Sequence, residues 1–175
     1  SATDFDGDGD IDVLSGSSID STAAWYENDG NQNFSIHVID GSVDSILGPF
    51  ALDVDGDGDI DVLSVSGQTG EKYWYENLGH GPHPQRAITN GADGVVDFVA
   101  TDVDDDGDVD FFSASYVGNT IAWHENDGEA NFTEHLVSTT ADGPRKVFAT
   151  DLDGDGDIDV LSASFRDDKI AWYEN

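Results

Sequence analysis

The sequence predicts an all-β protein made of four repeats of one short-stranded unit, and three observations lead to this class. An acidic stretch, first seen as "TDFDGDGDIDVLS" at residues 3–15, returns three times at steps of 49 residues. The first aspartates of its four copies are Asp4, Asp53, Asp102 and Asp151. A "WYEN" or "WHEN" motif keeps the same step, beginning at Trp25, Trp74, Trp123 and Trp172. Between these motifs, short apolar runs alternate with Gly, Asn and Asp clusters, and no helical period is present.

The elements of one repeat follow in order in the third copy. Apolar runs of four to seven residues, rich in Val, Ile, Phe and Trp, predict antiparallel strands between turn signals. They are "VAT" before the acidic loop, then "VDFFSAS", "TIAWHEN" and "TEHLVST". Asn, Asp and Gly tolerate positive φ, so "NDG" at 28–30 and 126–128 predicts tight hairpin turns.

Four strands in 49 residues match the length of a β-propeller blade, about 40–50 residues in the known classes. We therefore predict one propeller array over residues 1–175, with four units at 1–49, 50–98, 99–147 and 148–175. The last unit has no counterpart of the fourth run, so we expect its blade to lack the outer strand.

The tryptophans fall in the predicted third strand of each unit. A large aromatic side chain at the same place in every blade is expected to fill the layer between neighbouring sheets, with stacking on sugars as the alternative. Serines alternate with apolar residues in "VLSAS" and its relatives, which is typical of a tightly packed inner strand.

The charge of the chain narrows the classes of partner. With 38 acidic and 6 basic residues the formal net charge is −32, which disfavours nucleic acid and anionic membranes. The sequence has no cysteine, so no disulfide framework, thiol nucleophile or thiolate metal site is available. No apolar run reaches membrane-spanning length, so we expect no membrane insertion.

The spacing of the acidic stretch points to a bound cation. Two carboxylates about 5 Å apart repel by roughly 3 kcal/mol at an effective dielectric near 20, so such a loop either opens or holds a cation. Asp at positions 1, 3 and 5, Gly at 6, a carbonyl at 7 and an acid at 9 is the start of a calcium loop. The predicted metal residues are Asp4, Asp6, Asp8, Asp10 and Asp12; Asp53, Asp55, Asp57, Asp59 and Asp61; Asp102, Asp104, Asp106, Asp108 and Asp110; and Asp151, Asp153, Asp155, Asp157 and Asp159.

Two related sites are excluded or disfavoured. An EF-hand needs flanking helices and a Glu at position 12, whereas a serine stands there in every copy. Magnesium is disfavoured because a flexible cage with many carboxylates suits the larger ion. The cofactor predicted is therefore Ca²⁺, one per loop and four per chain, which reduces the net charge from −32 to −24.

The "DxDxDGDxD" loop between two short strands, repeated with aromatic third strands, resembles the FG-GAP and VCBS repeats of calcium-binding β-propellers. That group includes integrin α-subunit heads and lectins. The resemblance implies that the loop joins the first and second strands of a blade. It also implies that positions 1, 3, 5 and 9 bind calcium through their side chains and position 7 through its carbonyl. Such propellers have seven or eight blades, whereas this chain has four units.

The missing strands lead to a prediction about partners. Neither end of the array carries a spare strand to close a ring, and unpaired edges invite another chain. We expect self-association, with two chains completing an eight-bladed ring, or neighbouring repeats of a longer chain. A complete four-bladed ring is the alternative.

The sequence favours a calcium-stabilised binding module, lectin-like or adhesive, in an extracellular, periplasmic or cell-surface setting. Calcium sites of extracellular modules bind at about 0.1 mM and would be mostly empty in the cytosol. A spacer segment of a larger secreted protein is the alternative, and a carbohydrate-active enzyme is less favoured because repeated carboxylates are explained as ligands. One break in the repeat, "NLGHGPHPQR" at 77–86, places His80 and His83 in a variant loop. The other histidines, His37, His124 and His135, are interpreted as packing residues.

Overall fold

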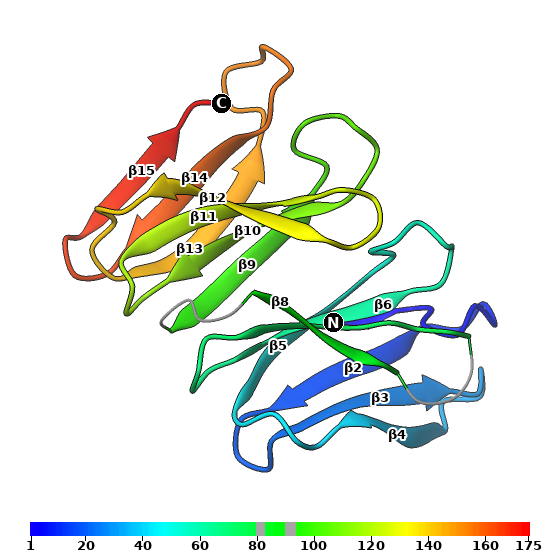
Figure 1. The fold of residues 1–175 in the computed structure, drawn as a ribbon. Coiled ribbons are helices and arrows are strands. Elements are labelled where there is room, and N and C mark those ends of the chain that lie inside the picture. Colours follow the sequence, from blue (N-terminus) through cyan, green and yellow to red (C-terminus); the bar gives the residue numbers. More distant parts are fainter. Residues whose placement is uncertain (80–82, 90–93) are drawn as a thin grey trace. The chain divides into compact units, whose positions relative to one another are not determined.

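The computed structural model describes residues 1–79, 83–89 and 94–175, and it consists of strands and turns (Figure 1). Fifteen strands form four antiparallel sheets, which we number 1 to 4 in chain order. Sheets 1, 2 and 3 have four strands and sheet 4 has three. Repeated four-stranded sheets and a last sheet without its outer strand are therefore confirmed, while closure into a propeller ring stays a prediction. The described residues contain no helix that could cross a membrane.

The chain divides into two compact units, and the first is Ser1–Asn90. It contains sheets 1 and 2, in which each strand pairs with the next along the chain. Sheet 1 is formed by β1 (Ala2–Thr3), β2 (Asp12–Ser17), β3 (Thr22–Asn28) and β4 (Phe34–Asp40). Sheet 2 is formed by β5 (Ile46–Leu52), β6 (Asp61–Ser66), β7 (Lys72–Tyr75) and β8 (Gln85–Thr89).

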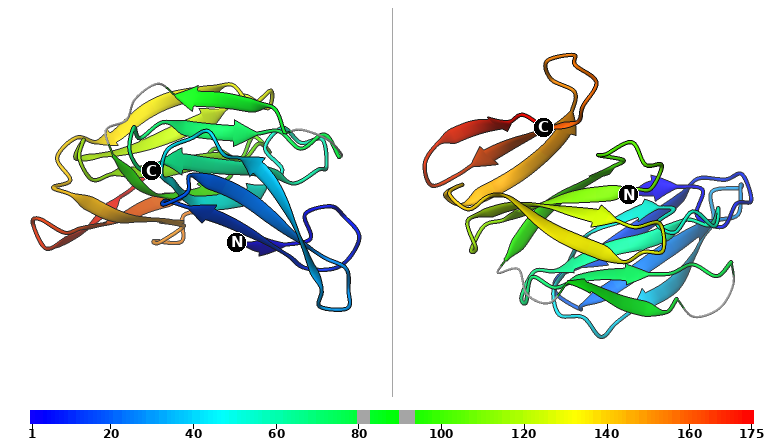
Figure 2. Two further views of the ribbon diagram at one scale, coloured as in Figure 1. Left: turned by 90° about the horizontal axis from the view of Figure 1, so that it is seen from below. Right: turned by 45° about the horizontal axis from the view of Figure 1, so that its top comes forward.

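The second unit, Gly91–Asn175, contains sheets 3 and 4. Sheet 3 is formed by β9 (Val95–Thr101), β10 (Asp110–Ser115), β11 (Thr120–Asn126) and β12 (Phe132–Ser138). Sheet 4 is formed by β13 (Pro144–Thr150), β14 (Asp159–Ser164) and β15 (Lys169–Tyr173). Figure 2 shows the orange and red strands of sheet 4 beside the green and yellow strands of sheet 3.

Burial within a sheet follows the order of its strands. Every residue of β6 and of β10 is buried, whereas most residues of the outer strands β4 and β12 are exposed. The serines of the second strands are part of this buried layer, for example Ser64 and Ser113. Small side chains there allow the neighbouring sheet to approach closely, as the alternation in the sequence predicts.

Each unit is held together by an apolar core between its two sheets. In the first unit, Phe5 and Leu14 pack with Val62 and Tyr75 of sheet 2. In the second unit, Phe112 and Ile121 of sheet 3 pack with Val147 and Val160 of sheet 4. Full burial of one such side chain stabilises a fold by about 1.5–3 kcal/mol, so a sheet depends on its neighbour for much of its stability.

Three of the four tryptophans have the predicted packing role. Trp74 is 1% exposed, and Trp25 and Trp123 are partly buried against the cores of their units. Trp172, in the three-stranded sheet 4, is 46% exposed. At Trp25 and Trp123, the large aromatic residue of this repeat position is therefore covered by the next sheet of the same unit.

Candidate functional site

The four acidic loops each connect the first and second strands of a sheet, as the resemblance implies. Their sixth position is always glycine with a large positive φ, between 97° and 107°. Residues other than glycine are strained at this φ. The backbone conformation and not a steric clash therefore requires glycine, because a Cβ added at Gly58 or Gly107 has no neighbour within 4 Å. The fourth position is less demanding, because Asp105 occupies it in the third loop with φ at 60°.

A network of backbone hydrogen bonds shapes each loop. The carboxylate at the first position accepts the N–H of the glycine at the sixth position, at 3.0 Å for Asp4 and 3.1 Å for Asp102. The carboxylate at the fifth position accepts the N–H of the seventh residue, for example Asp10 N–H to Asp8 at 2.8 Å. Each loop is thus closed around its own carboxylates, which turns their remaining oxygens toward one another.

The structure gathers three carboxylates in every loop, with one oxygen from each lying within 4.8 Å of the others. The first and third positions belong to all four groups, the fifth position joins in the first two loops, and the ninth position joins in the last two. The groups are Asp4, Asp6 and Asp8; Asp53, Asp55 and Asp57; Asp102, Asp104 and Asp110; and Asp151, Asp153 and Asp159. All side-chain positions that the resemblance implies as calcium ligands therefore occur in these groups.

The aspartates at the seventh position lie elsewhere. In the first loop this side chain points toward the turn after the third strand, where a Cβ added at Gly30 would lie 2.4 Å from Asp10 Oδ2. In the third loop, a Cβ added at Gly128 would lie 2.5 Å from Asp108 Oδ2. The carbonyl role that the resemblance implies for these residues stays a prediction.

The donor set fits a divalent cation. Asp4 Oδ1 and Asp102 Oδ1 are buried and have no hydrogen-bond partner within the described residues. A buried carboxylate oxygen without a partner is costly, and an ion bound by the group would supply that partner. Three or more carboxylates without nitrogen or sulfur donors are the ligands that Ca²⁺ prefers. An ion there would neutralise the like charges of the loop.

Mutual repulsion of the carboxylates is visible in their pKa values. Burial raises the pKa of Asp55, and the adjacent Asp57 carboxylate raises it further. Asp104 has a raised pKa for the same reasons, with Asp106 as the neighbour. Without a cation the third-position carboxyls therefore hold protons more tightly than free aspartate does.

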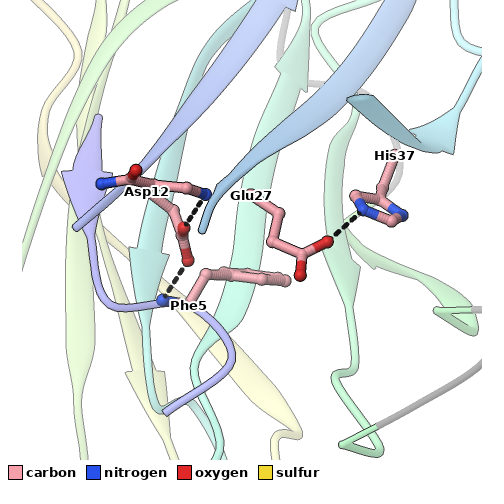
Figure 3. A network of polar contacts seen from close by, with 5 residues as sticks. Phe5, Asp12, Glu27 and His37 are labelled. Atoms are coloured by element: carbon pink, nitrogen blue, oxygen red, sulfur yellow. Dashed lines mark hydrogen bonds and ion pairs between the residues drawn. The ribbon is translucent and has the colours of Figure 1, made fainter. Parts of the chain in front are cut away.

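The ninth-position aspartates also fix the loop to its sheet. Asp12 is 1% exposed, and its two oxygens accept the backbone N–H groups of Phe5 at 2.9 Å and Asn28 at 2.8 Å (Figure 3). The same pair of bonds recurs at Asp61, Asp110 and Asp159. Burial raises the pKa of Asp61 to about 6 and also raises that of Asp110. This carboxylate therefore joins the start of the loop to the end of the third strand.

The asparagine of the "WYEN" motif is a functional residue that sequence reasoning missed. Besides donating its backbone N–H to the ninth-position aspartate, Asn28 donates its side-chain amide to the carbonyl of Ile11 at 3.1 Å. Asn77 and Asn126 do the same to Ile60 at 3.0 Å and Val109 at 3.2 Å. The available signal was its recurrence with the aspartates at the same step.

A second repeated arrangement lies on the third and fourth strands. The ring of His37 stacks on Trp25, with the ring centres 4.6 Å apart. The Nε2 atom of His37 lies 2.6 Å from Glu27 Oε2 (Figure 3). His135 repeats this in sheet 3, on Trp123 at 4.8 Å and beside Glu125 at 2.6 Å. In sheet 2 a cation takes the same place: Arg86 lies over Trp74 at 4.7 Å and contacts Glu76 at 2.7 Å.

Of the three histidines interpreted as packing residues, His124 is buried, whereas His37 and His135 are exposed and pack by one ring face on a tryptophan. His124 is fully buried, stacks on Phe111 at 4.3 Å and lies 3.0 Å from the hydroxyl of Ser113. His83 is partly buried 5.8 Å from the Phe5 ring, and burial lowers its pKa. His80 lies outside the described residues, so a joint role of the two loop histidines stays untested.

A pocket lies at the junction of sheets 1 and 2, next to the first acidic loop. Its volume is 590 Å³, within the range of small-molecule sites. Its lining combines aromatic rings with a few polar groups, including Phe5, Asp6, Trp25, His37, Asn77 and His83. The corresponding junction of sheets 3 and 4 encloses only 80 Å³, lined by Val103, Trp123 and Asn175 among others.

The matches to a protein-family model have the same repeat as the acidic loops. A family model described as FG-GAP-like repeat matches residues 4–64, 53–113 and 102–162, so each match begins at the first aspartate of a loop. A search of curated proteins gives no match.

Among solved structures, this chain is similar to an Agrocybe aegerita lectin described by its specific recognition of non-reducing terminal N-acetylglucosamine. The identity is 20%, the TM-score is 0.63, and the match covers 99% of this chain and 51% of the lectin. It is also similar to the V. cholerae biofilm matrix protein Bap1, with 20% identity and a TM-score of 0.65, over 98% of this chain and 26% of Bap1. The chain thus spans about half and about a quarter of these two proteins, and the likeness concerns the fold.

The three matches together run from the first acidic loop to the last, and they agree with the loop geometry and with the sheet architecture. The chain belongs to the FG-GAP-like repeat family.

Proposed function

We propose that this chain is a calcium-stabilised carbohydrate-binding module, and that the pocket at the junction of sheets 1 and 2 takes the sugar. The observation that carries this proposal is the lining of that 590 Å³ pocket. Its lining combines the aromatic rings of Trp25 and Phe5 with the polar side chains of Asp6, His37 and Asn77. Sugars present both an apolar ring face and hydroxyl groups, so this combination suits them.

Calcium has a supporting role in this proposal. Asp6 both lines the pocket and belongs to the first carboxylate group, so an ion in that loop would fix one wall of the pocket. Asn77, Gly79 and His83 of sheet 2 also line the pocket, and the His83 ring lies 5.8 Å from the ring of Phe5. Removal of calcium should therefore weaken sugar binding through the shape of the pocket.

The test is binding of the purified chain to a glycan array, with calcium and with a chelator. We expect calcium-dependent binding of neutral glycans in the wild type. His37→Ala should abolish it, whereas His135→Ala should not. His135 has the same stack and the same glutamate contact, but it lies at the junction with the 80 Å³ pocket. Equal loss in both variants, or no glycan binding at all, would contradict the proposal.

We further propose that the module acts outside the cytoplasm, because loops of this type bind calcium at concentrations found there. Its support is the agreement of four carboxylate groups in register. We also propose that the module has no catalytic activity of its own. Turnover of a bound glycan that persists in the purified chain and is abolished by His83→Ala would overturn this part.

Self-association is a separate part of the proposed function. Ile121 in sheet 3 is fully buried against sheet 4, whereas its repeat equivalent Ile170 in sheet 4 is 81% exposed. Phe148 and Trp172 of the same sheet are also exposed, at 58% and 46%. An apolar sheet face of this kind is suited to covering by another repeat, from a second copy or from a longer array.

A further inference from the structure

The second unit carries a cluster of arginine and aromatic side chains at the end of its sheets that is remote from the acidic loops. Tyr116 follows β10, Arg145 lies in β13, and Phe165 and Arg166 follow β14. The guanidinium carbons of Arg145 and Arg166 lie 4.5 Å and 4.4 Å from the centre of the Tyr116 ring. Arg145 also lies 5.3 Å from the centre of the Phe165 ring. We call these four residues the arginine cluster.

The repeat architecture does not require this cluster. The same junction in the first unit has Ser18, Leu47, Gly67 and Gln68 at the equivalent positions, 98 residues earlier. Its backbone frame is the same, because Gly67 N–H donates to Ser45 at 2.8 Å and Phe165 N–H donates to Gly143 at 2.9 Å. The first junction leaves an open pocket of 440 Å³ lined by small and polar residues. The cluster is therefore an addition to a junction that forms without it.

The arginine cluster also differs from other cationic side chains of the protein in its carboxylate partners. Arg86, Lys146 and Lys169 each lie within 3.0 Å of a carboxylate oxygen. Arg145, by contrast, is exposed and has no carboxylate partner within the described residues. Two of the three arginines of a chain with net charge −32 thus converge on one tyrosine.

The polar groups around the cluster leave its arginine side chains accessible to a ligand. Arg166 lies 3.7 Å from Asp142 and 3.3 Å from the Asn119 amide oxygen, and its side chain remains 41% exposed. The nearby Arg166 and then Arg145 lower the pKa of the Tyr116 hydroxyl. Among the described residues, the carboxylate of Asp142 is the one within ion-pair distance of these two guanidiniums.

The chemistry of the cluster defines its ligand. A guanidinium that stacks by its face on an aromatic ring keeps its edge N–H groups free, and this planar fork matches a carboxylate. Beside it, Phe165 is 64% exposed and Val117 is 59% exposed, so an apolar surface adjoins the cations. A carboxylate carried on a ring with an apolar face meets both requirements.

We propose that the arginine cluster binds the carboxylate of a terminal acidic sugar on an otherwise neutral glycan. The choice of a saccharide rests on the proposed function, whereas the choice of a carboxylate rests on the two arginines. A single acidic residue fits better than a polyanion, because a chain with net charge −32 repels a ligand with many negative charges. At physiological salt, repulsion from charges more than about 8 Å away is largely screened. The two nearby arginines therefore determine whether a single carboxylate binds.

The test compares three disaccharides in binding titrations followed by calorimetry and by NMR. They are glucuronic acid linked to glucose, its methyl ester, and cellobiose. We expect the acid to bind at least roughly tenfold more tightly than the ester, which keeps the size of the sugar but removes its charge. Arg145→Gln with Arg166→Gln should remove this preference. Lys146→Gln with Lys169→Gln, which changes the net charge equally, should keep it.

The remaining outcomes separate the two proposals. If neutral glycans bind and the acid has no advantage, the arginine cluster proposal is wrong while the proposed function stands. The same conclusion follows if a short peptide with one aspartate binds more tightly than the acidic disaccharide. If the acid preference persists in the double arginine variant, the carboxylate is recognised elsewhere and the proposal is also wrong. Thermal unfolding of each variant checks that the fold is intact.

Discussion

Variants of the ninth-position aspartate Asp110 can distinguish the structural role of the acidic loop from the metal-binding role that we propose for it. Its carboxylate accepts two buried backbone N–H groups, from Asn126 at 2.7 Å and from Val103 at 3.1 Å. Asp110→Ala leaves both donors without a partner, and each costs about 1–3 kcal/mol. The expected loss is therefore about 2–6 kcal/mol in the free energy of unfolding, even in a chelator. Asp110→Asn keeps one acceptor and should lose about half as much.

Two variants in the same loop provide the comparison. Asp108→Ala removes an aspartate that points away from the carboxylate group, so it should change stability by less than about 0.5 kcal/mol. Asp102→Asn removes a group ligand whose Oδ1 has no protein partner, so it should be nearly neutral in a chelator. In calcium at about a hundred times the dissociation constant, it should forfeit up to about 2.7 kcal/mol of stabilisation.

The measurement is urea unfolding followed by tryptophan fluorescence, once in EDTA and once in calcium. Our reasoning fails if Asp110→Ala costs less than about 1 kcal/mol in EDTA, because two lost buried hydrogen bonds cannot cost so little. It also fails if Asp102→Asn costs as much in EDTA as in calcium. The first result would refute the anchoring role, and the second would refute the metal-binding role.

Three further predictions concern the glycines, the acidity and the exposed sheet. Gly107→Ala should destabilise the fold by about 1 kcal/mol or more, because its φ of 99° strains any residue other than glycine. Gly56→Asp should be tolerated, because Asp105 occupies the same loop position in the third repeat with a positive φ. Thermal unfolding of the two variants tests this difference. Because the pKa of Asp61 is raised to about 6, the folded metal-free protein binds this proton more tightly than the unfolded chain. The free energy of unfolding of the metal-free protein should therefore increase by about 2 kcal/mol as the pH falls from 7 to 4. Unfolding measured across this pH range tests the prediction, and a decrease in stability would disprove it. Ile170→Lys should shift any oligomer toward the monomer in light scattering after chromatography, while a wild type that is monomeric at high concentration would rule out self-association.

Much of the fold was predictable because one pattern occurs four times. A single acidic loop has several interpretations, but the strict step of 49 residues fixes the strand order and the position of each loop between two strands. The second-strand serines and the third-strand tryptophans follow the same step, and the structure buries serines such as Ser64 and three of the four tryptophans as predicted, Trp172 being the exception. Repetition therefore supplied the information that a unique sequence lacks.

The details that sequence reasoning missed depend on contacts between different strands. The amide of Asn28 reaches the carbonyl of Ile11 only because β2 and β3 are paired in one register. The partition of carboxylates between groups, with the fifth position in two loops and the ninth in the others, depends on side-chain torsions that spacing does not fix. Arg145 and Arg166 are 21 positions apart, and only the packing of sheet 4 on sheet 3 places both on Tyr116.

The two hydrogen bonds of Asp12 have a consequence for how such chains lengthen. Both partners of that carboxylate, Phe5 and Asn28, belong to its own repeat, and so do the three members of the carboxylate group beside it. A duplication of one 49-residue segment would therefore copy an acidic loop together with its carboxylate group and these two hydrogen bonds. The apolar layer between sheets would need mutual adjustment after such an event, whereas the acidic loops would be inherited ready to use.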